Sequence, residues 1–168
     1  MPPKAVVVVR LLPDSRYFEL FGLTPALNLD LKDLEQRYFR LSRQWHPDLF
    51  VRKSAAEQQT ALDQTALLND AYRTLRNPVR RAEYFVGPDE KQSAPPPELL
   101  EEVFELNMAI EEGERSELEV YSKRFSDMLA AADAELAAAS HPDGIRSILN
   151  RRKYIHNLVR DVQKALHA

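Results

Sequence analysis

The 168-residue sequence contains no cysteine, which excludes disulfide bonds, thiolate nucleophiles and cysteine-ligated zinc sites. A cysteine-free chain fits a reducing compartment, and we expect a cytoplasmic protein. Only four residues are glycine, and none forms a glycine-rich phosphate-binding loop. The longest strongly apolar run, residues 5–9, is far shorter than the roughly 20 residues needed to span a bilayer, and we expect neither a membrane segment nor a secretory signal.

An excess of one charge is also lacking, since 23 Lys and Arg residues stand against 26 Asp and Glu residues. This balance argues against nucleic acid as a partner. The four histidines, His46, His141, His156 and His167, show no metal-ligand spacing such as H-E-x-x-H, and no nucleophile elbow is present. We therefore expect a protein that is not an enzyme and that has neither a metal site nor a cofactor.

The apolar residues, 44% of the chain, follow helical spacing, and strand-like alternation is almost absent. Residues 5–9 are the exception, and they could form a short strand, a docked tail or a disordered lead. A proline-rich segment at residues 87–97 ends in three consecutive prolines, which favour an extended spacer. The sequence thus predicts an all-α protein with an extension (residues 1–16), a first domain (17–86), this linker and a second domain (98–168).

The first domain is predicted to contain four helices. A short helix covers residues 17–22, and a second runs from residue 31 to residue 45 behind Asp30 as N-cap. Its apolar side chains recur at spacings of three and four, at Leu31, Leu34, Tyr38, Leu41 and Trp45. A third helix covers residues 54–76, and a short fourth begins after Asn77, with Pro78 at its first position.

The segment most informative about function is His46-Pro47-Asp48, which follows the basic second helix and precedes the long third helix. Together with Tyr17–Leu23, Arg43–Asp48, Leu68–Leu75 and Arg81–Tyr84, it resembles a J-domain, the module that activates DnaK-type chaperone ATPases. The first and last of these segments are most similar to the HscB family, the J-proteins of iron–sulfur cluster assembly. That family also continues into a three-helix C-terminal domain after a short linker.

The resemblance implies a chaperone-binding surface around the tripeptide, in which Asp48 engages an arginine of the chaperone's ATPase domain. We expect this surface to comprise His46, Pro47, Asp48, Arg37, Arg40, Arg43 and Gln44. The proline stiffens the loop, so that docking costs little entropy, and the arginines would speed encounter with an acidic partner. A second copy of the tripeptide, at residues 141–143, lacks a preceding basic helix and is interpreted as an ordinary helix start.

The second domain is predicted to contain three helices, over residues 97–112, 114–139 and 142–166. On the first of them, one apolar face is expected to be bundle core, at Leu99, Val103, Leu106 and Ile110. A second apolar face, at Leu100, Phe104 and Met108, either widens the core or binds a partner. Residues 97–112 carry six glutamates and no basic residue, whereas residues 145–164 carry six basic residues and one aspartate. These two helices are therefore expected to attract each other as neighbours.

The family resemblance assigns Leu100, Phe104, Glu105 and Tyr154 to the surface that binds the cluster scaffold protein IscU. Glu101 departs from the family pattern, because an apolar residue is common at that position. We therefore expect a co-chaperone that stimulates a dedicated HscA-like, DnaK-type chaperone and delivers the iron–sulfur scaffold to it. The alternatives are a J-protein that serves another client in general folding, and a helical adaptor in which the tripeptide is coincidental.

Overall fold

The computed structural model describes residues 14–88, 95–139 and 141–168, and every regular element in these ranges is helical, which confirms the all-α prediction. The chain divides into two compact units, residues 1–87 and residues 88–168. The apolar run at residues 5–9, whose structure the sequence left open, lies outside the described residues.

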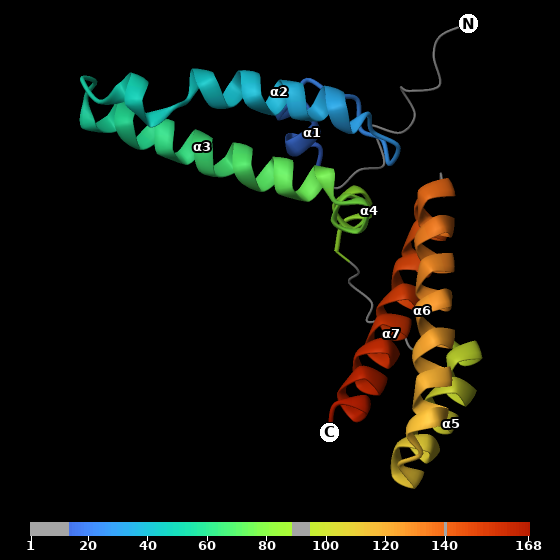
Figure 1. The fold of residues 1–168 in the computed structure, drawn as a ribbon. Helices are drawn as coiled ribbons and strands as arrows, with labels where there is room; N and C mark the ends of the chain where they lie inside the picture. The colour runs from blue at the N-terminus through green and yellow to red at the C-terminus, as the bar shows by residue number, and fades with distance from the viewer. Residues whose placement is uncertain (1–13, 89–94, 140) are drawn as a thin grey trace, which may run out of the picture. The chain divides into compact units, whose positions relative to one another are not determined.

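The N-terminal unit is built on a helical hairpin. Its elements are α1 (Arg16–Leu20), α2 (Leu31–Gln44), the 3-10 turn η3 (Pro47–Phe50), α3 (Ala55–Arg76) and α4 (Pro78–Val86). In Figure 1, α2 and α3 run antiparallel, α1 lies against them, and α4 follows the C-terminal end of α3. The fully buried side chains come from all four α-helices and include Phe18, Leu34, Leu68, Leu75 and Ala82.

Local capping explains where these helices begin. Asp30 accepts hydrogen bonds from two backbone N–H groups in the first turn of α2, at 2.9 and 3.2 Å. Ser54 and Glu57 form a reciprocal capping box at the start of α3. Asn77 caps α4 in the same way as Asp30 caps α2, and Pro78 occupies the first position of α4. The predicted starts of α2, α3 and α4 agree with these caps to within one residue.

The buried Arg81 of α4 connects the C-terminal end of α3 to the loop before α2. Arg81 of α4 donates from Nε to the carbonyl of Leu27 (2.7 Å) and from Nη1 to the carbonyl of Leu75 (2.5 Å). Burial lowers the pKa of Arg81 below its usual value. The charged hydrogen bond to the Leu27 carbonyl holds the loop between α1 and α2 against α4.

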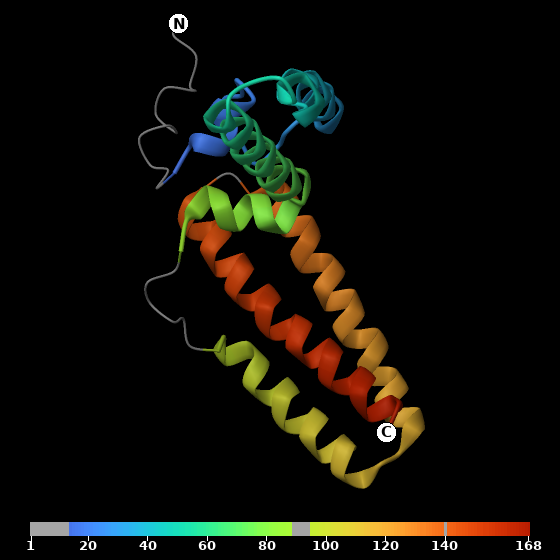
Figure 2. The same cartoon turned by 90° about the vertical axis from the view of Figure 1, so that its left-hand side faces the viewer.

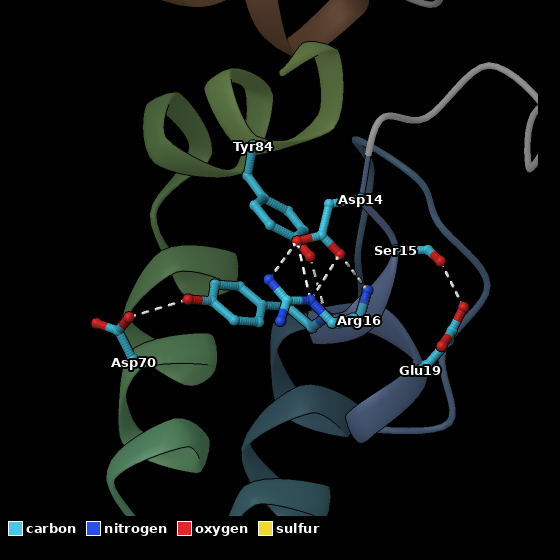
Figure 3. Close-up of polar contacts among 7 residues, drawn as sticks. Asp14, Ser15, Arg16, Glu19, Asp70 and Tyr84 are labelled. Atoms are coloured by element: carbon cyan, nitrogen blue, oxygen red, sulfur yellow. Dashed lines mark hydrogen bonds and ion pairs between the residues drawn. The ribbon is translucent and has the colours of Figure 1, made fainter. Parts of the chain in front are cut away.

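An aromatic and polar cluster fastens α1 to α3 and α4 (Figure 3). The rings of Tyr17 and Tyr84 stack at 4.5 Å, the Tyr17 backbone N–H donates to the Tyr84 hydroxyl, and the Tyr17 hydroxyl donates to Asp70 (2.9 Å). Burial raises the pKa of Tyr84 to about 12. Hydrogen bonds from Arg16 lower the pKa of Asp14 to about 2.

The C-terminal unit is a bundle of three helices. Its elements are the 3-10 turn η4 (Pro97–Leu99), α5 (Leu100–Glu112), α6 (Arg115–Ala138) and α7 (Pro142–Leu166). Figure 2 shows α6 and α7 as long neighbours, with the shorter α5 beside them. Gly113 ends α5 with a positive φ of 71°, a conformation that favours glycine. The core residues include Leu99, Leu106, Phe125, Ala132, Ile155 and Val162.

Candidate functional site

The tripeptide at residues 46–48 forms a rigid, exposed turn. His46 caps the 3-10 turn η3, and its Nδ1 accepts a hydrogen bond from the backbone N–H of Asp48 (3.3 Å). The same Nδ1 lies 3.4 Å from Asp48 Oδ2. The Asp48 side chain is nevertheless 84% exposed, so its carboxylate is accessible to a bidentate donor such as a partner's arginine.

Aromatic stacking and two polar side chains from α3 support this turn and the segment that follows it. The rings of Trp45 and Phe50, which flank the tripeptide, stack with an interplanar angle of 8° and a centroid distance of 6.0 Å. The Thr65 hydroxyl donates to the Trp45 carbonyl (3.0 Å). The Gln58 amide donates to the carbonyl of Lys53 (3.0 Å). These contacts restrain the loop, and a restrained loop loses less conformational entropy on docking.

The basic residues predicted for this surface separate into two groups. Arg40, Arg43 and Gln44 are exposed on α2. Arg37, in contrast, is half-buried, and its Nη1 donates to the carbonyls of Phe21 and Gly22 at 2.9 and 3.0 Å. It also pairs with a carboxylate one turn earlier on α2. Arg37 thus acts within the domain, where it connects the end of α1 to α2.

Sequence reasoning overlooked Phe39 on α2. This ring is 53% exposed, although the outer face of the helix was predicted to be polar and basic. The available signal was its position, because Phe39 falls outside the stripe formed by Leu34, Tyr38 and Leu41. An aromatic residue that breaks a helical stripe in this way is expected to point toward solvent.

The apolar face of α5 is wider than the sequence predicted. Leu100, Phe104 and Met108 are exposed, with Phe104 67% exposed. Val103 and Ile110, which we predicted as core, are also exposed, so that prediction is wrong. The reason is that α5 packs on a narrow stripe, which consists of Leu99, Leu106 and Ala109 together with the half-buried Glu102 and Glu105.

Ion pairs attach the flanking helices to α6. Arg124 of α6 contacts Glu102 (2.5 Å) and Glu105 (3.5 Å) on α5. From α7, Arg151 pairs with Glu135, and Arg152 pairs with Asp133 at 2.5 Å. The acidic α5 and the basic α7 were expected to attract each other directly. The described inter-helix ion pairs of α5 and α7 are formed with α6, which supplies Arg124 to the first and Asp133 and Glu135 to the second.

Tyr154 lies beside one end of the α5 face. Its partly buried ring packs against the cluster of Leu99, Ala132 and Ile155. Leu99 directly precedes Leu100, so Tyr154 is near the N-terminal end of the exposed stripe. Glu105 lies on α5, five residues after Leu100, and is paired with Arg124. Of the four residues assigned to scaffold binding, Leu100 and Phe104 are thus the most accessible.

The second copy of the tripeptide has a similar local geometry in a different setting. His141 precedes α7, Pro142 is its first residue, and His141 Nδ1 lies 4.0 Å from Asp143 Oδ2. Within the ranges that the structure describes, no group of three or more His, Asp or Glu side chains is placed to hold a metal ion. None of the helices described is long and apolar enough to cross a membrane.

Comparisons with known proteins match both units. The family described as "DnaJ domain" matches residues 16–84, and the family described as "HSCB C-terminal oligomerisation domain" matches residues 95–163. A Co-chaperone protein HscB homolog of Neisseria meningitidis is 47% identical over 72 residues, and the match spans 43% of this chain and 43% of that relative. A homolog of the same description from Vibrio vulnificus is 32% identical over 162 residues, which cover 88% of this chain and 94% of the relative.

Two solved structures are similar over most of the chain. Chaperone HscB from Vibrio cholerae has a TM-score of 0.65 and 29% identity, with 88% of this chain and 95% of that chain covered. The crystal structure of human co-chaperone protein HscB has a TM-score of 0.59 and 26% identity, with 90% and 83% covered. An exposed His-Pro-Asp turn on a J-domain hairpin, a three-helix C-terminal bundle and a full-length relative above 30% identity lead to one conclusion: the chain belongs to the HscB family of J-domain co-chaperones.

Proposed function

We propose that this chain stimulates the ATPase of an HscA-like, DnaK-type chaperone and delivers the iron–sulfur scaffold protein, which is IscU-like, to that chaperone. The observation that carries the proposal is the presence of two exposed surfaces of opposite character on two units of one chain. One is the charged turn at residues 46–48, and the other is the apolar stripe on α5. We further propose a cytoplasmic site of action, since a cysteine-free chain suits a reducing compartment.

On the N-terminal unit, the chaperone docks at the Asp48 carboxylate, which accepts a bidentate hydrogen bond from an arginine of the ATPase domain. His46 and Pro47 hold that carboxylate in position. Arg40 and Arg43 face solvent and form no ion pair with another described residue. Their charge attracts an acidic chaperone surface and accelerates encounter. We leave Arg37 out of this surface, because its Nε and Nη1 donate to groups inside the domain.

On the C-terminal unit, the scaffold packs on Leu100 and Phe104, with Tyr154 at the margin. The exposed glutamates around this stripe resemble the polar rim of an interface, and an apolar patch of this kind on a folded domain is typical of a binding site. The chain itself catalyses no reaction in this account. Its contribution is to hold two partners on one molecule, which raises the effective concentration of each near the other.

The scaffold surface is tested by measuring scaffold binding calorimetrically for Phe104→Ala and for a control, Val120→Ala. Val120 lies on α6 and is 66% exposed, almost the same as Phe104. We expect Phe104→Ala to weaken scaffold binding by about 1–3 kcal/mol, as a hot spot does, and Val120→Ala to leave it unchanged.

Thermal melts of the free variants complete this test. Phe104→Ala should destabilise the fold by less than the roughly 3–5 kcal/mol typical of a buried phenylalanine. A large fall in melting temperature with unchanged scaffold affinity would show that the stripe belongs to the core. Intact chaperone stimulation without selective scaffold binding would instead favour the alternative, a J-protein for another client.

A further inference from the structure

Phe39 is an aromatic side chain on the outer surface of α2, next to the exposed Arg40 and Arg43. At roughly 100° per residue, it lies one turn before the exposed Arg43 and on the same side of the helix. It is also seven residues, or two turns, before His46, which places it about 10 Å along the helix from the tripeptide. The ring is 53% exposed, so an apolar surface lies between the exposed Arg43 one turn later and the exposed Glu35 one turn earlier.

The Phe39 ring rests on an ordered aromatic ladder. Its centroid is 5.5 Å from that of Tyr38, whose own ring stacks on Tyr72 at 4.1 Å with an interplanar angle of 13°. The Tyr38 hydroxyl donates to Asn69 Oδ1 on α3 (2.8 Å). The guanidinium of Arg76 lies over the Tyr72 ring, 5.4 Å from its centroid. Phe39 is therefore held against a fixed support, and a side chain with only two rotatable bonds loses little entropy when a partner covers it.

A single exposed phenylalanine is common on protein surfaces and by itself indicates nothing. Two features distinguish Phe39 from that background. First, it lies on the same helix as the exposed Arg40 and Arg43, two turns before the turn that presents Asp48. Second, the fold supports its ring without burying it. Aromatic residues with rigid support, surrounded by charges, are typical of interface anchors.

We propose that Phe39 determines which DnaK-type chaperone the chain activates. The partner surface would be an apolar depression in the chaperone's ATPase domain, bordered by the acidic residues that face Arg40 and Arg43. This inference rests on the proposed function of the tripeptide. Charge attraction guides the chain toward any chaperone with an acidic docking face, whereas an apolar contact requires a matching shape. Arg40 and Arg43 thus raise the rate of encounter with a chaperone, and Phe39 discriminates between chaperones.

The test measures chaperone ATPase activity as a function of co-chaperone concentration, with a cognate HscA-type chaperone and with a general DnaK-type chaperone. For Phe39→Ala we expect the concentration for half-maximal stimulation of the cognate chaperone to rise about 5- to 30-fold, with the maximal rate retained. For the general chaperone we expect a change of less than about threefold. The control is Leu31→Ala, a residue of similar exposure (49%) at the far end of α2, which should change neither value.

Two further variants separate the possible outcomes. Phe39→Lys replaces the apolar side chain with a cation, and we expect it to lose selectivity for the cognate chaperone as Phe39→Ala does. If Phe39→Lys equals or exceeds the parent chain, charge alone guides docking and the inference is wrong. Asp48→Asn serves as the reference for the tripeptide itself. If Asp48→Asn removes stimulation but Phe39→Ala behaves like Leu31→Ala, only the role of Phe39 fails, whereas unchanged stimulation by Asp48→Asn overturns the proposed function itself.

Discussion

The two His-Pro-Asp segments of this chain adopt almost the same local form. In each, the histidine precedes a helix, the proline is the first helical residue, and the imidazole Nδ1 lies near the aspartate, at 3.4 Å in residues 46–48 and 4.0 Å in residues 141–143. Both aspartates are exposed, at 84% and 90%. The local geometry of the tripeptide therefore does not distinguish a docking site from a helix start.

The difference lies in what surrounds each copy. The first copy leads into a four-residue 3-10 turn whose last residue, Phe50, stacks on Trp45 just before the tripeptide. It also follows α2, with Arg40 and Arg43 exposed near its end. The second copy leads directly into the 25 residues of α7, where Asp143 stabilises the positive end of the helix. On the proposed function, the supported turn and the charged helix beside it, rather than the tripeptide alone, mark the docking site.

The largest expected effect comes from removing each aspartate charge in turn. Asp48→Asn should abolish stimulation of the chaperone ATPase, because the amide cannot form the same charged bidentate pair. Asp143→Asn should leave stimulation nearly intact. Neither substitution should reduce helicity much, since an exposed surface carboxylate usually contributes less than about 0.5 kcal/mol. Steady-state ATPase assays and circular dichroism check both points, and an equal loss from both variants would contradict the distinction between the copies.

The second expected effect concerns the unit that carries the first copy. We expect residues 1–92 to fold without the second unit and to keep part of the ATPase stimulation, but to lose any increase that the scaffold adds. Such a short fragment is expected to be stable by only a few kcal/mol. Circular dichroism should show a cooperative melt. A coil spectrum would mean that the proposed boundary is misplaced and that the tripeptide needs both units.

A smaller effect separates structural from docking arginines near the first copy. Arg37→Ala should lower the free energy of unfolding by about 1–3 kcal/mol, because the carbonyls of Phe21 and Gly22 lose a charged donor. Arg43→Ala should leave stability within about 0.5 kcal/mol and should instead raise the co-chaperone concentration needed for half-maximal stimulation. Denaturant unfolding and ATPase titrations measure the two quantities. The reverse pattern would place Arg37 on the docking surface.

The smallest expected effect is the pH dependence of the free energy of unfolding of the N-terminal unit. The pKa of Tyr84 is raised to about 12 by burial, against about 10 in an unfolded chain. The stability that comes from neutral Tyr84 is therefore complete below pH 10 and is lost as the pH rises from 10 to 12. Tyr84→Phe should make this alkaline loss shallower. At neutral pH it should cost about 0.5–1.5 kcal/mol, since the Tyr17 N–H loses its acceptor.

Local signals made most of the helices predictable. Asp30, Asn77 and Gly113 act through hydrogen bonds and backbone angles within a few residues, so their roles can be read from neighbouring sequence. The first and last residues of α7 were predicted correctly, and Pro142 fixes its start. The turn at residues 46–48 could be identified for the same reason.

Long-range contacts could not be predicted in this way. The carbonyls that hold Arg37 lie 15 and 16 positions away in the sequence, and spacing on one helix says nothing about them. The exposure of Val103 depends on how α5 rotates against α6, where Arg124 draws Glu102 inward. Helical periodicity defines the faces of a helix, but tertiary packing decides which of them is covered.

The central claim is that one chain links two partners through two separate surfaces. The most direct test is the chaperone ATPase rate added by the scaffold, measured for the parent chain and for an equimolar mixture of Asp48→Asn and Phe104→Ala chains. Protein concentrations are kept where light scattering shows monomers. The mixture contains both intact surfaces, but on different molecules. The account predicts a scaffold-dependent increase for the parent chain and none for the mixture, whereas full restoration by the mixture would contradict it.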